Sequence, residues 1–331
     1  MRGTRPFMHA PPMPRTVFAS GLTKDYGDGA GVFDLNLEID PGSIVGFVGP
    51  SGSGKTTAIR LMTGVMKPDS GQIEVLGERP VDFTRSTRAR LGYMPQHAIL
   101  YPDLTLRENL NFAASLYGMP YRRKDLMARL VEFVELEGAM DRLPRQASGG
   151  EKRRVMLAST LIHDPELIFL DEPTAGIDPV LRRKFWERFR ELADDERTLL
   201  VTTQYVGEAA YCDHVAVLAE GRILTLNTPQ GLRKEAYGGD QYEVAFAAPP
   251  PPDQLTSLAR LALREPEWID SRTVRLVVED ATETGPAVSR WAEERGVDLE
   301  KSEAYQAEYD DVFVELVSRL ANGSEKERDD V

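Results

Sequence analysis

The segment Gly49-Pro50-Ser51-Gly52-Ser53-Gly54-Lys55-Thr56-Thr57 decides the fold of the first part of the chain. It matches the P-loop pattern G-x-x-x-x-G-K-[ST], in which backbone N–H groups of a glycine-rich loop surround a chain of phosphates. An apolar run of strand length, 43–48, precedes the segment, and residues 58–62 after it read as a helix. The N-terminus of that helix adds partial positive charge at the same point. These flanks favour a P-loop over the alternative, a glycine-rich turn with a chance lysine.

The chemistry of such a loop assigns roles to two of its side chains and calls for a partner strand. Lys55 can reach the β- and γ-phosphates, and the Thr56 hydroxyl can bind Mg²⁺. Residues 167–170 are apolar and end in two adjacent carboxylates, Asp171 and Glu172. Because the carboxyl ends of parallel strands line a ligand crevice, Asp171 is placed to face Mg²⁺ through water. Glu172 is placed to orient or deprotonate the attacking water, whereas solvated acids at a strand end are the alternative.

Two further segments have the chemistry of a phosphate site. Gln96 ends the strand-like run 91–95, where its amide can contact Mg²⁺ or the water; an exposed loop residue is the alternative. Ser148, Gly149 and Gly150 precede a helix that continues through Leu161, which makes a second anion site or an ordinary helix cap. One nucleotide needs two distant anion sites only if they close on it from opposite sides, so this pattern predicts a dimer.

Together these motifs resemble the ATP-binding subunit of an ABC transporter over nearly all of residues 17–240. The resemblance identifies the P-loop, the Q-loop at Gln96, the signature segment 147–151, the Walker B strand 167–172 and a D-loop, Ala175-Gly176-Ile177-Asp178, in the family's order. It implies an α/β P-loop NTPase cassette with a mixed sheet core and a helical subdomain. It also implies that Tyr26 stacks on adenine, although by position alone Tyr26 could be a strand-edge tyrosine.

The sequence departs from the family pattern at two points. The signature has Ala147 and Glu151 where leucine and glutamine are common, and Gln204 follows the strand-like run 198–203 where a switch histidine is usual. Glutamine can donate a hydrogen bond to a γ-phosphate oxygen but cannot carry a positive charge. Either hydrolysis relies on Glu172 alone as general base, or turnover is slow. The Thr-Thr-Gln-Tyr sequence and the segment 311–316 resemble the daunorubicin-exporter branch, whose permeases are of the ABC-2 type.

The resemblance implies an ATPase subunit that binds ATP and Mg²⁺ and powers an exporter by ATP-driven closure of a dimer, with a homodimer expected. Its partner is an integral-membrane permease in a separate chain, which places the subunit at the cytoplasmic face of the cell membrane. Apolar residues after the Q-loop either contact the permease or belong to the subdomain core: Ile99, Leu100, Tyr101 and Leu104. Two alternatives remain. Gln204 leaves open an ATP-sensing regulatory module with little hydrolysis, and a soluble ABC-type ATPase that acts on ribosomes or DNA is disfavoured by the single P-loop.

Composition and charge divide the chain into four parts. We predict a disordered arm at 1–15, the nucleotide-binding domain at 16–240, a small domain at 241–322 and a polar tail at 323–331. Over 241–331 there are 21 acidic and 10 basic residues, against 32 and 30 before it, which argues against nucleic acid as a partner. The basic runs 122–124, 152–154 and 182–184 read as solvated helix faces. No run of 18 apolar residues occurs, so nothing is expected to span a bilayer, and one cysteine excludes an internal disulfide.

The last part of the chain reads as a small α+β domain. The elements are a strand at 242–246, a helix at 255–263, a hairpin of 268–269 with 274–278, a helix at 288–294, a strand at 297–300 and a last helix with an apolar face through Val312 and Leu316. The order β-α-β-β-α-β-α suggests a ferredoxin-like fold. The polyproline stretch 248–252 is a loop inside this domain or an interdomain linker, and the strand before it favours the loop.

Overall fold

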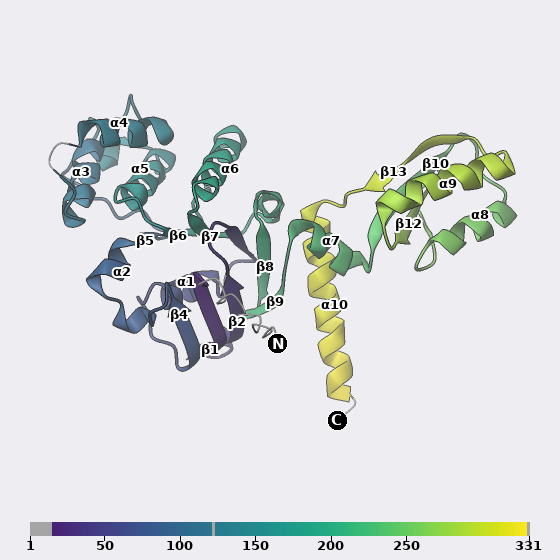
Figure 1. Cartoon of the computed structure of the whole chain (residues 1–331), viewed down its shortest axis with the longest axis horizontal. Helices are drawn as coiled ribbons and strands as arrows, with labels where there is room; N and C mark the ends of the chain where they lie inside the picture. Colours follow the sequence, from purple (N-terminus) through teal and green to yellow (C-terminus); the bar gives the residue numbers. More distant parts are fainter. Residues whose placement is uncertain (1–14, 121–122, 330–331) are drawn as a thin grey trace, which may run out of the picture. The chain divides into compact units, whose positions relative to one another are not determined.

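The computed structural model describes residues 15–120 and 123–329 and divides into two compact units. The first unit contains the chain up to Gln204 and residues 220–223; the second contains residues 205–219 and the chain from 224 onward. Figure 1 shows the elements of each unit in sequence colours. Most of the predicted N-terminal arm and Arg122 lie outside the described residues. The domain boundary at residue 240 stays a prediction.

The first unit is built on a parallel sheet with the strand order β5 (Leu91–Met94), β6 (Leu167–Asp171), β7 (Thr198–Thr203) and β3 (Ile44–Val48). Every residue of β3, β6 and β7 is buried, as expected for strands with both faces covered. The register pairs Asp171 with Thr202, and Val48 with Thr203. The carboxyl ends of these strands therefore meet at one edge, and the strands that the sequence predicted are confirmed.

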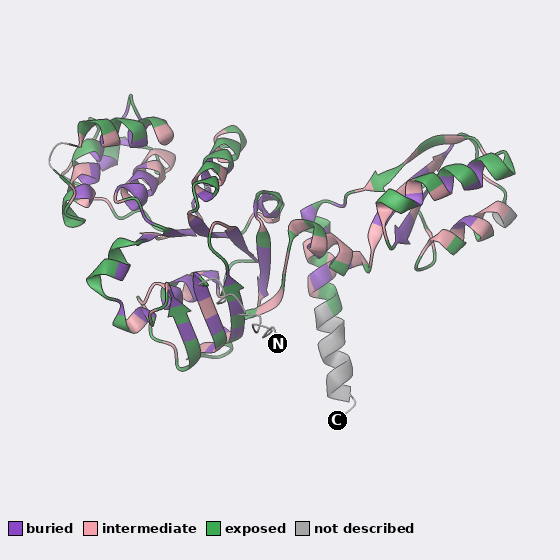
Figure 2. Cartoon of the chain, viewed as in Figure 1, coloured by how far each residue is buried: buried purple, intermediate pink, exposed green. Residues whose placement is uncertain are grey.

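Helices and a second sheet complete this unit. Figure 1 shows α3, α4 and α5 gathered together, as expected for a helical subdomain, and Figure 2 shows buried residues along the strands with exposed residues on the outer helix faces. The helices are α1 (Lys55–Met62), α2 (Arg85–Ala89), α3 (Leu106–Leu116), α4 (Lys124–Phe133), α5 (Gly149–Leu161) and α6 (Pro179–Asp194). An antiparallel sheet has the order β2 (Ala30–Ile39), β1 (Val17–Gly27) and β4 (Ser70–Val75).

The second unit carries a four-stranded antiparallel sheet of the order that a ferredoxin-like fold requires. Alternate residues of its strands, among them Val244 and Leu276, pack against Trp291, whose Nε1 donates to Ser257 Oγ at 2.8 Å. The predicted element order is confirmed. In spatial order the strands of this sheet are β11 (Glu267–Trp268), β12 (Thr273–Val278), β10 (Asp240–Phe246) and β13 (Leu299–Tyr305). The other elements of the unit are β8 (His214–Ala219), most of β9 (Arg222–Asn227), α7 (Pro229–Tyr237), α8 (Pro252–Leu258), α9 (Ala281–Arg295) and α10 (Tyr309–Asp329).

Some element boundaries in the second unit differ from the prediction. Helix α9 begins at Ala281, seven residues before the predicted start, because the Asp280 side chain accepts from Thr282 N and caps the helix, which then contains Pro286. Helix α10 continues to Asp329, past the predicted start of the polar tail. The polyproline stretch is the loop between β10 and α8, which the sequence favoured over a linker, and its last residue, Pro252, begins α8. Among the described residues, no helix combines the length and apolar character needed to cross a membrane.

Candidate functional site

The glycine-rich loop between β3 and α1 holds its lysine close to its own backbone. Gly54 has a φ of +99°, and a Cβ at this position would lie 2.9 Å from the carbonyl oxygen of Gly31, so no other residue fits without a shift. Lys55 Nζ donates to the carbonyl oxygens of Gly49 at 2.7 Å and Pro50 at 2.9 Å, which leaves a third N–H for a phosphate oxygen.

The lysine is buried beside two acids. Burial lowers the pKa of Lys55, and the carboxylates of Glu172 and Asp171 oppose that shift. The positive charge at the loop is thus held by nearby negative charge in a setting with little water, where its attraction to a phosphate is strong.

Asp171 joins three elements at the carboxyl edge of the parallel sheet. Its Oδ1 accepts hydrogen bonds from Thr56 Oγ1 at 3.1 Å and Thr202 Oγ1 at 2.7 Å. Its Oδ2, like Ser53 Oγ, is buried and has no hydrogen-bond partner among the described residues. Because unpartnered buried oxygens are costly, a carboxylate of this kind next to a threonine hydroxyl fits Mg²⁺ with its waters.

Glu172 adopts an unusual backbone conformation that its neighbours hold in place. Its φ is +53°, in the left-handed region that a residue with a side chain rarely occupies. Its N–H points to Thr202, at 3.1 Å from the carbonyl oxygen and 3.0 Å from Oγ1, and its own carbonyl accepts from Arg153 Nη1 at 2.6 Å. Strained residues of this kind concentrate at functional sites, where surrounding contacts fix them.

Arg153 of α5 connects three site segments through their main chain. Its guanidinium donates to the carbonyl oxygens of Gln96 at 2.9 Å, Glu172 at 2.6 Å and Ala175 at 2.8 Å. The interpretation of run 152–154 as a solvated helix face was therefore wrong for Arg153. It was also wrong for Arg154, which donates to the carbonyls of residues 134 and 135. A run of charges on a helix does not reveal which long side chains turn inward.

Sequence reasoning also missed Thr202. Its hydroxyl donates to Asp171 Oδ1 and accepts from Glu172 N, so one buried side chain positions both acids. The signal available was a hydroxyl at the carboxyl end of an otherwise apolar strand.

The remaining predicted residues lie at separate points of the first unit. Gln96 follows β5, and its main-chain carbonyl accepts from the same arginine, Arg153, as the carbonyl of Glu172. Gln204 follows β7 and is exposed. Tyr26 is the penultimate residue of β1 and is half-exposed, and its hydroxyl donates to Met66 Sδ at 2.8 Å. Asp178 caps α6 by accepting from the N–H groups of residues 180 and 181. Tyr26 and Asp178 share no hydrogen bond with the acids among the described residues.

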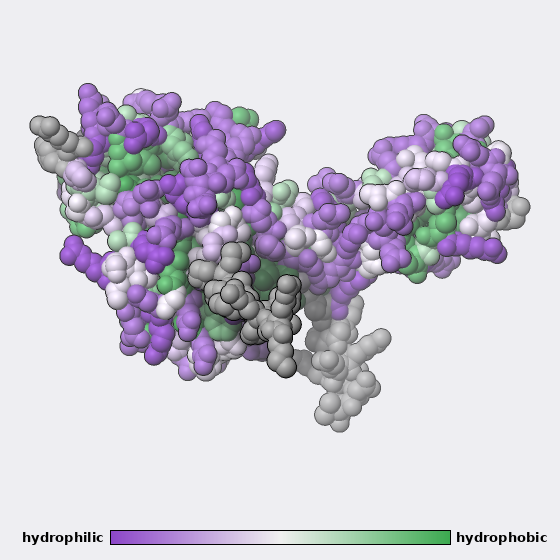
Figure 3. All heavy atoms as spheres, in the orientation of Figure 1, coloured by the Kyte–Doolittle hydropathy of each residue, from purple (hydrophilic) through white to green (hydrophobic). Residues whose placement is uncertain are grey.

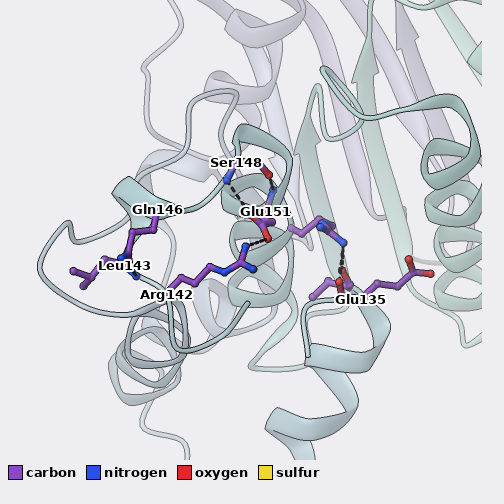
Figure 4. A network of polar contacts seen from close by, with 8 residues as sticks. Glu135, Arg142, Leu143, Gln146, Ser148 and Glu151 are labelled. Atoms are coloured by element: carbon purple, nitrogen blue, oxygen red, sulfur yellow. Dashed lines mark hydrogen bonds and ion pairs between the residues drawn. The ribbon is translucent and has the colours of Figure 1, made fainter. Parts of the chain in front are cut away.

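The signature segment forms the N-terminus of α5 (Figure 4). Ser148 Oγ accepts from Glu151 N at 3.1 Å, and Ser148 N donates to Glu151 Oε2 at 2.7 Å, which is a capping box. Glu151 Oε1 accepts from Arg142 Nη1 at 2.9 Å. The hydrogen bonds from Ser148, with the smaller effect of the Arg142 charge, hold the pKa of Glu151 below its usual range. Ser148 and Gly149 are exposed, so this helix end is open to a ligand.

Comparison with known proteins identifies the family. Residues 32–175 match the model described as ABC transporter. The chain is 35% identical over 301 residues to Nod factor export ATP-binding protein I of Paraburkholderia xenovorans, with 90% of this chain and 95% of that protein aligned. It is 34% identical over 304 residues to daunorubicin resistance ATP-binding protein DrrA3 of Streptomyces coeruleorubidus, covering 91% and 95%. It is also 38% identical to the probable multidrug ABC transporter ATP-binding protein YbhF of Escherichia coli, covering 78% of this chain but only 45% of that protein.

Solved structures show the same cassette fold. An ATP-binding subunit of an ABC transporter superposes with a TM-score of 0.61 at 29% identity, covering 67% of this chain and 93% of that one. The dimeric, post-hydrolysis ATP-binding cassette MJ0796 with ADP and phosphate bound gives 0.60 at 26% identity, covering 64% and 98%. With two relatives aligned over nearly their whole length, the chain belongs to the ABC transporter family of ATP-binding proteins.

Proposed function

We propose that the chain is the ATP-hydrolysing subunit of an ABC-2-type exporter and acts at the cytoplasmic face of the membrane through a separate permease. The observation that carries the ATPase assignment is the hydrogen bond from Thr56 to Asp171, which joins the phosphate loop to the acidic strand and leaves Asp171 Oδ2 unpartnered. The export assignment rests on the relatives, two of which are named for export or drug resistance.

Residues at the sheet edge divide the work of hydrolysis. The backbone N–H groups of the loop 49–57, apart from Pro50, which has none, and the Lys55 ammonium bind the phosphates. Thr56, Asp171 and Gln96 would hold Mg²⁺, which neutralises charge that develops on the phosphates. Glu172 takes the proton of the attacking water, and its fixed backbone keeps the carboxylate in position. Gln204 donates a hydrogen bond to the γ-phosphate but carries no charge.

The exposed turn at Ser148, Gly149 and Gly150 completes the site in a second copy of the chain. Each ATP lies between the phosphate loop of one subunit and this turn of the other, with Asp178 near the shared boundary. ATP favours the closed dimer only if it binds that state more tightly than the open subunits. The γ-phosphate supplies this difference because it alone reaches the second anion site.

An exposed apolar surface near the Q-loop is the proposed contact with the permease. Ile99 is 77% exposed, and the half-exposed ring of Tyr101 stands edge-to-face with Phe112, with ring centroids 4.7 Å apart. Leu116 and Tyr117 of the same helical region are also exposed, and Figure 3 shows hydrophobic atoms over α3, α4 and α5. Leu100 and Leu104 are partly buried and serve the subdomain core as well. Apolar patches of this kind mark interaction sites.

ATP-driven association tests the dimer. We expect the Glu172→Gln variant of the full chain to change from monomer to dimer when MgATP is added, because slow hydrolysis lets the closed state accumulate. Light scattering with size-exclusion chromatography measures the change, and MgADP is the control because it lacks the γ-phosphate. A mass that stays monomeric with MgATP would reject dimer closure.

Co-purification with a ribosome or DNA rather than with a membrane protein would favour the soluble-ATPase alternative.

Tyr26 offers a smaller test of adenine stacking. Tyr26→Ala is expected to raise the KM for ATP about fivefold to tenfold with little change in kcat, because stacking on a base contributes about 1–3 kcal/mol. Tyr26→Phe keeps the ring and should retain most of the affinity, which separates stacking from the hydroxyl contact with Met66. Equal KM values for the alanine variant and the unaltered chain would show that adenine binds elsewhere.

A further inference from the structure

Glu151 places a negative charge in the first turn of α5, beside the turn that is proposed to receive the γ-phosphate of ATP. An acid at this position stabilises the helix because it faces the positive end of the dipole. The same acid repels a phosphate, so its charge has to be balanced before the turn can act as an anion site. We propose that Arg142 is the positioning residue that balances it; this assignment rests on the proposed function.

Both oxygens of the Glu151 carboxylate are engaged within the chain (Figure 4). Oε2 accepts from Ser148 N at 2.7 Å, and Oε1 accepts from Arg142 Nη1 at 2.9 Å. The side chain of Glu151 is only 15% exposed, whereas that of Arg142 is 51% exposed. The carboxylate is therefore turned away from solvent, and the guanidinium presents the positive charge of the pair at the surface.

The backbone before α5 holds Arg142 within reach of the acid. Leu143 N donates to Gln146 Oε1 at 2.9 Å, and residues 144–146 form a single 3-10 turn (Figure 4). This turn brings Arg142 back to the start of a helix that begins seven residues later. Arg154 also lowers the pKa of Glu151, but its guanidinium is committed to the carbonyls of residues 134 and 135 and makes no ion pair with Glu151 among the described contacts.

The pair fixes the groups of the signature turn that a ligand would meet. Ser148 Oγ accepts from Glu151 N, and the Ser148 side chain also hydrogen-bonds the Glu151 carboxylate, so a bound phosphate would compete with that carboxylate for the hydroxyl proton. With Arg142 present, the turn offers this hydroxyl, the glycine N–H groups and a balanced charge. Without Arg142, the same donors would face a phosphate next to an uncompensated carboxylate.

Association in the Glu172→Gln background measures the effect. Arg142→Ala in the full chain is expected to weaken MgATP-dependent dimerisation about tenfold, because an uncompensated like charge near the phosphate opposes closure. Arg142→Lys keeps the charge and should retain most of the affinity. Raising the ionic strength to about 0.5 M should shrink the defect of the alanine variant, since the repulsion is screened. A merely structural defect would not respond to salt or to lysine in this way.

A double-mutant cycle with Glu151→Gln decides whether the two residues act together. When the carboxylate is replaced by the neutral amide, Arg142→Ala should have little further effect on association. Arg107→Ala is the matched control, because it breaks an exposed ion pair with Asp141 in the same region, also 2.9 Å long, without touching the signature turn. Its dimerisation should follow that of the parent protein.

The outcomes separate this assignment from the proposed function. Dimerisation that Arg142→Ala leaves intact, or weakens equally with Glu151 and with Gln at position 151, overturns the role of Arg142 while the ATP-driven dimer stands. Failure of the Glu172→Gln parent to dimerise with MgATP overturns the proposed function and this assignment with it. A defect that vanishes in the Glu151→Gln background supports both.

Discussion

Replacing Glu172 by glutamine is expected to lower the steady-state rate of ATP hydrolysis at least about a hundredfold, because a positioned general base contributes about 10²–10⁴ in rate. Glutamine has nearly the same shape, and its amide cannot take a proton from water at neutral pH. Residue 172 has a left-handed backbone, and we expect glutamine to tolerate it as glutamate does, so the strain should change little. Release of inorganic phosphate by the full chain, assembled with its permease, measures the rate.

The control for this prediction is Glu196→Gln. Glu196 is exposed and also has a positive φ, +66°, so its substitution changes the same charge in the same class of backbone conformation away from the site. Its rate should equal that of the unaltered chain. Equal and negligible rates for the unaltered chain and Glu172→Gln would instead favour the ATP-sensing module that Gln204 leaves open.

The sequence predicted the parts of the site that depend on short spacings. The phosphate loop, the acid pair and the capping serine each lie within one local segment, and strand ends of a parallel sheet meet at one edge whatever the details of packing. The same reasoning predicted the order of strands and helices along the second unit, because alternating and helical patterns are local. Helix α9 shows the limit of this reasoning: a proline in a helix interior is locally unfavourable, yet α9 contains Pro286, is capped by Asp280 and packs Trp291 into the core of the second unit.

Arg153 and Thr202 escaped prediction for a different reason. Each acts on residues that only the folded chain brings near. Arg153 meets carbonyls 57, 19 and 22 residues away, and Thr202 meets Asp171 across 31 residues. Every residue has a main-chain carbonyl, so the sequence does not indicate which carbonyl will accept a hydrogen bond. Spacing motifs predict local backbone structure, whereas these hydrogen bonds depend on how distant segments pack in the folded chain.

Removing the guanidinium of Arg153 is expected to lower kcat about thirtyfold to hundredfold, because a misplacement of about 1 Å near the reacting atoms costs about 10²-fold. The substitution Arg153→Ala leaves the carbonyls of Gln96, Glu172 and Ala175 without the charge that joins them. Glu172 then loses one of the contacts that hold its left-handed backbone, so its carboxylate moves away from the position of the attacking water. Arg153→Lys should recover only part of the rate, since one ammonium on a flexible stem cannot reproduce the planar fork.

The measurement has to separate positioning from stability, because hydrogen bonds to a charged group contribute about 1.5–3 kcal/mol each and their loss also lowers Tm. The rate is therefore compared well below the Tm of each variant, where circular dichroism shows the chain folded. Lys152→Ala is the control: Lys152 is the preceding residue on α5, and its side chain makes no hydrogen bond or ion pair among the described contacts. Its main-chain N–H donates to the Ser148 carbonyl, which alanine preserves, so its rate should match the unaltered chain. A lower Tm with kcat retained in Arg153→Ala would show that this arginine only stabilises the fold. A fall in kcat with the KM for ATP largely unchanged is expected of a residue that aligns the general base.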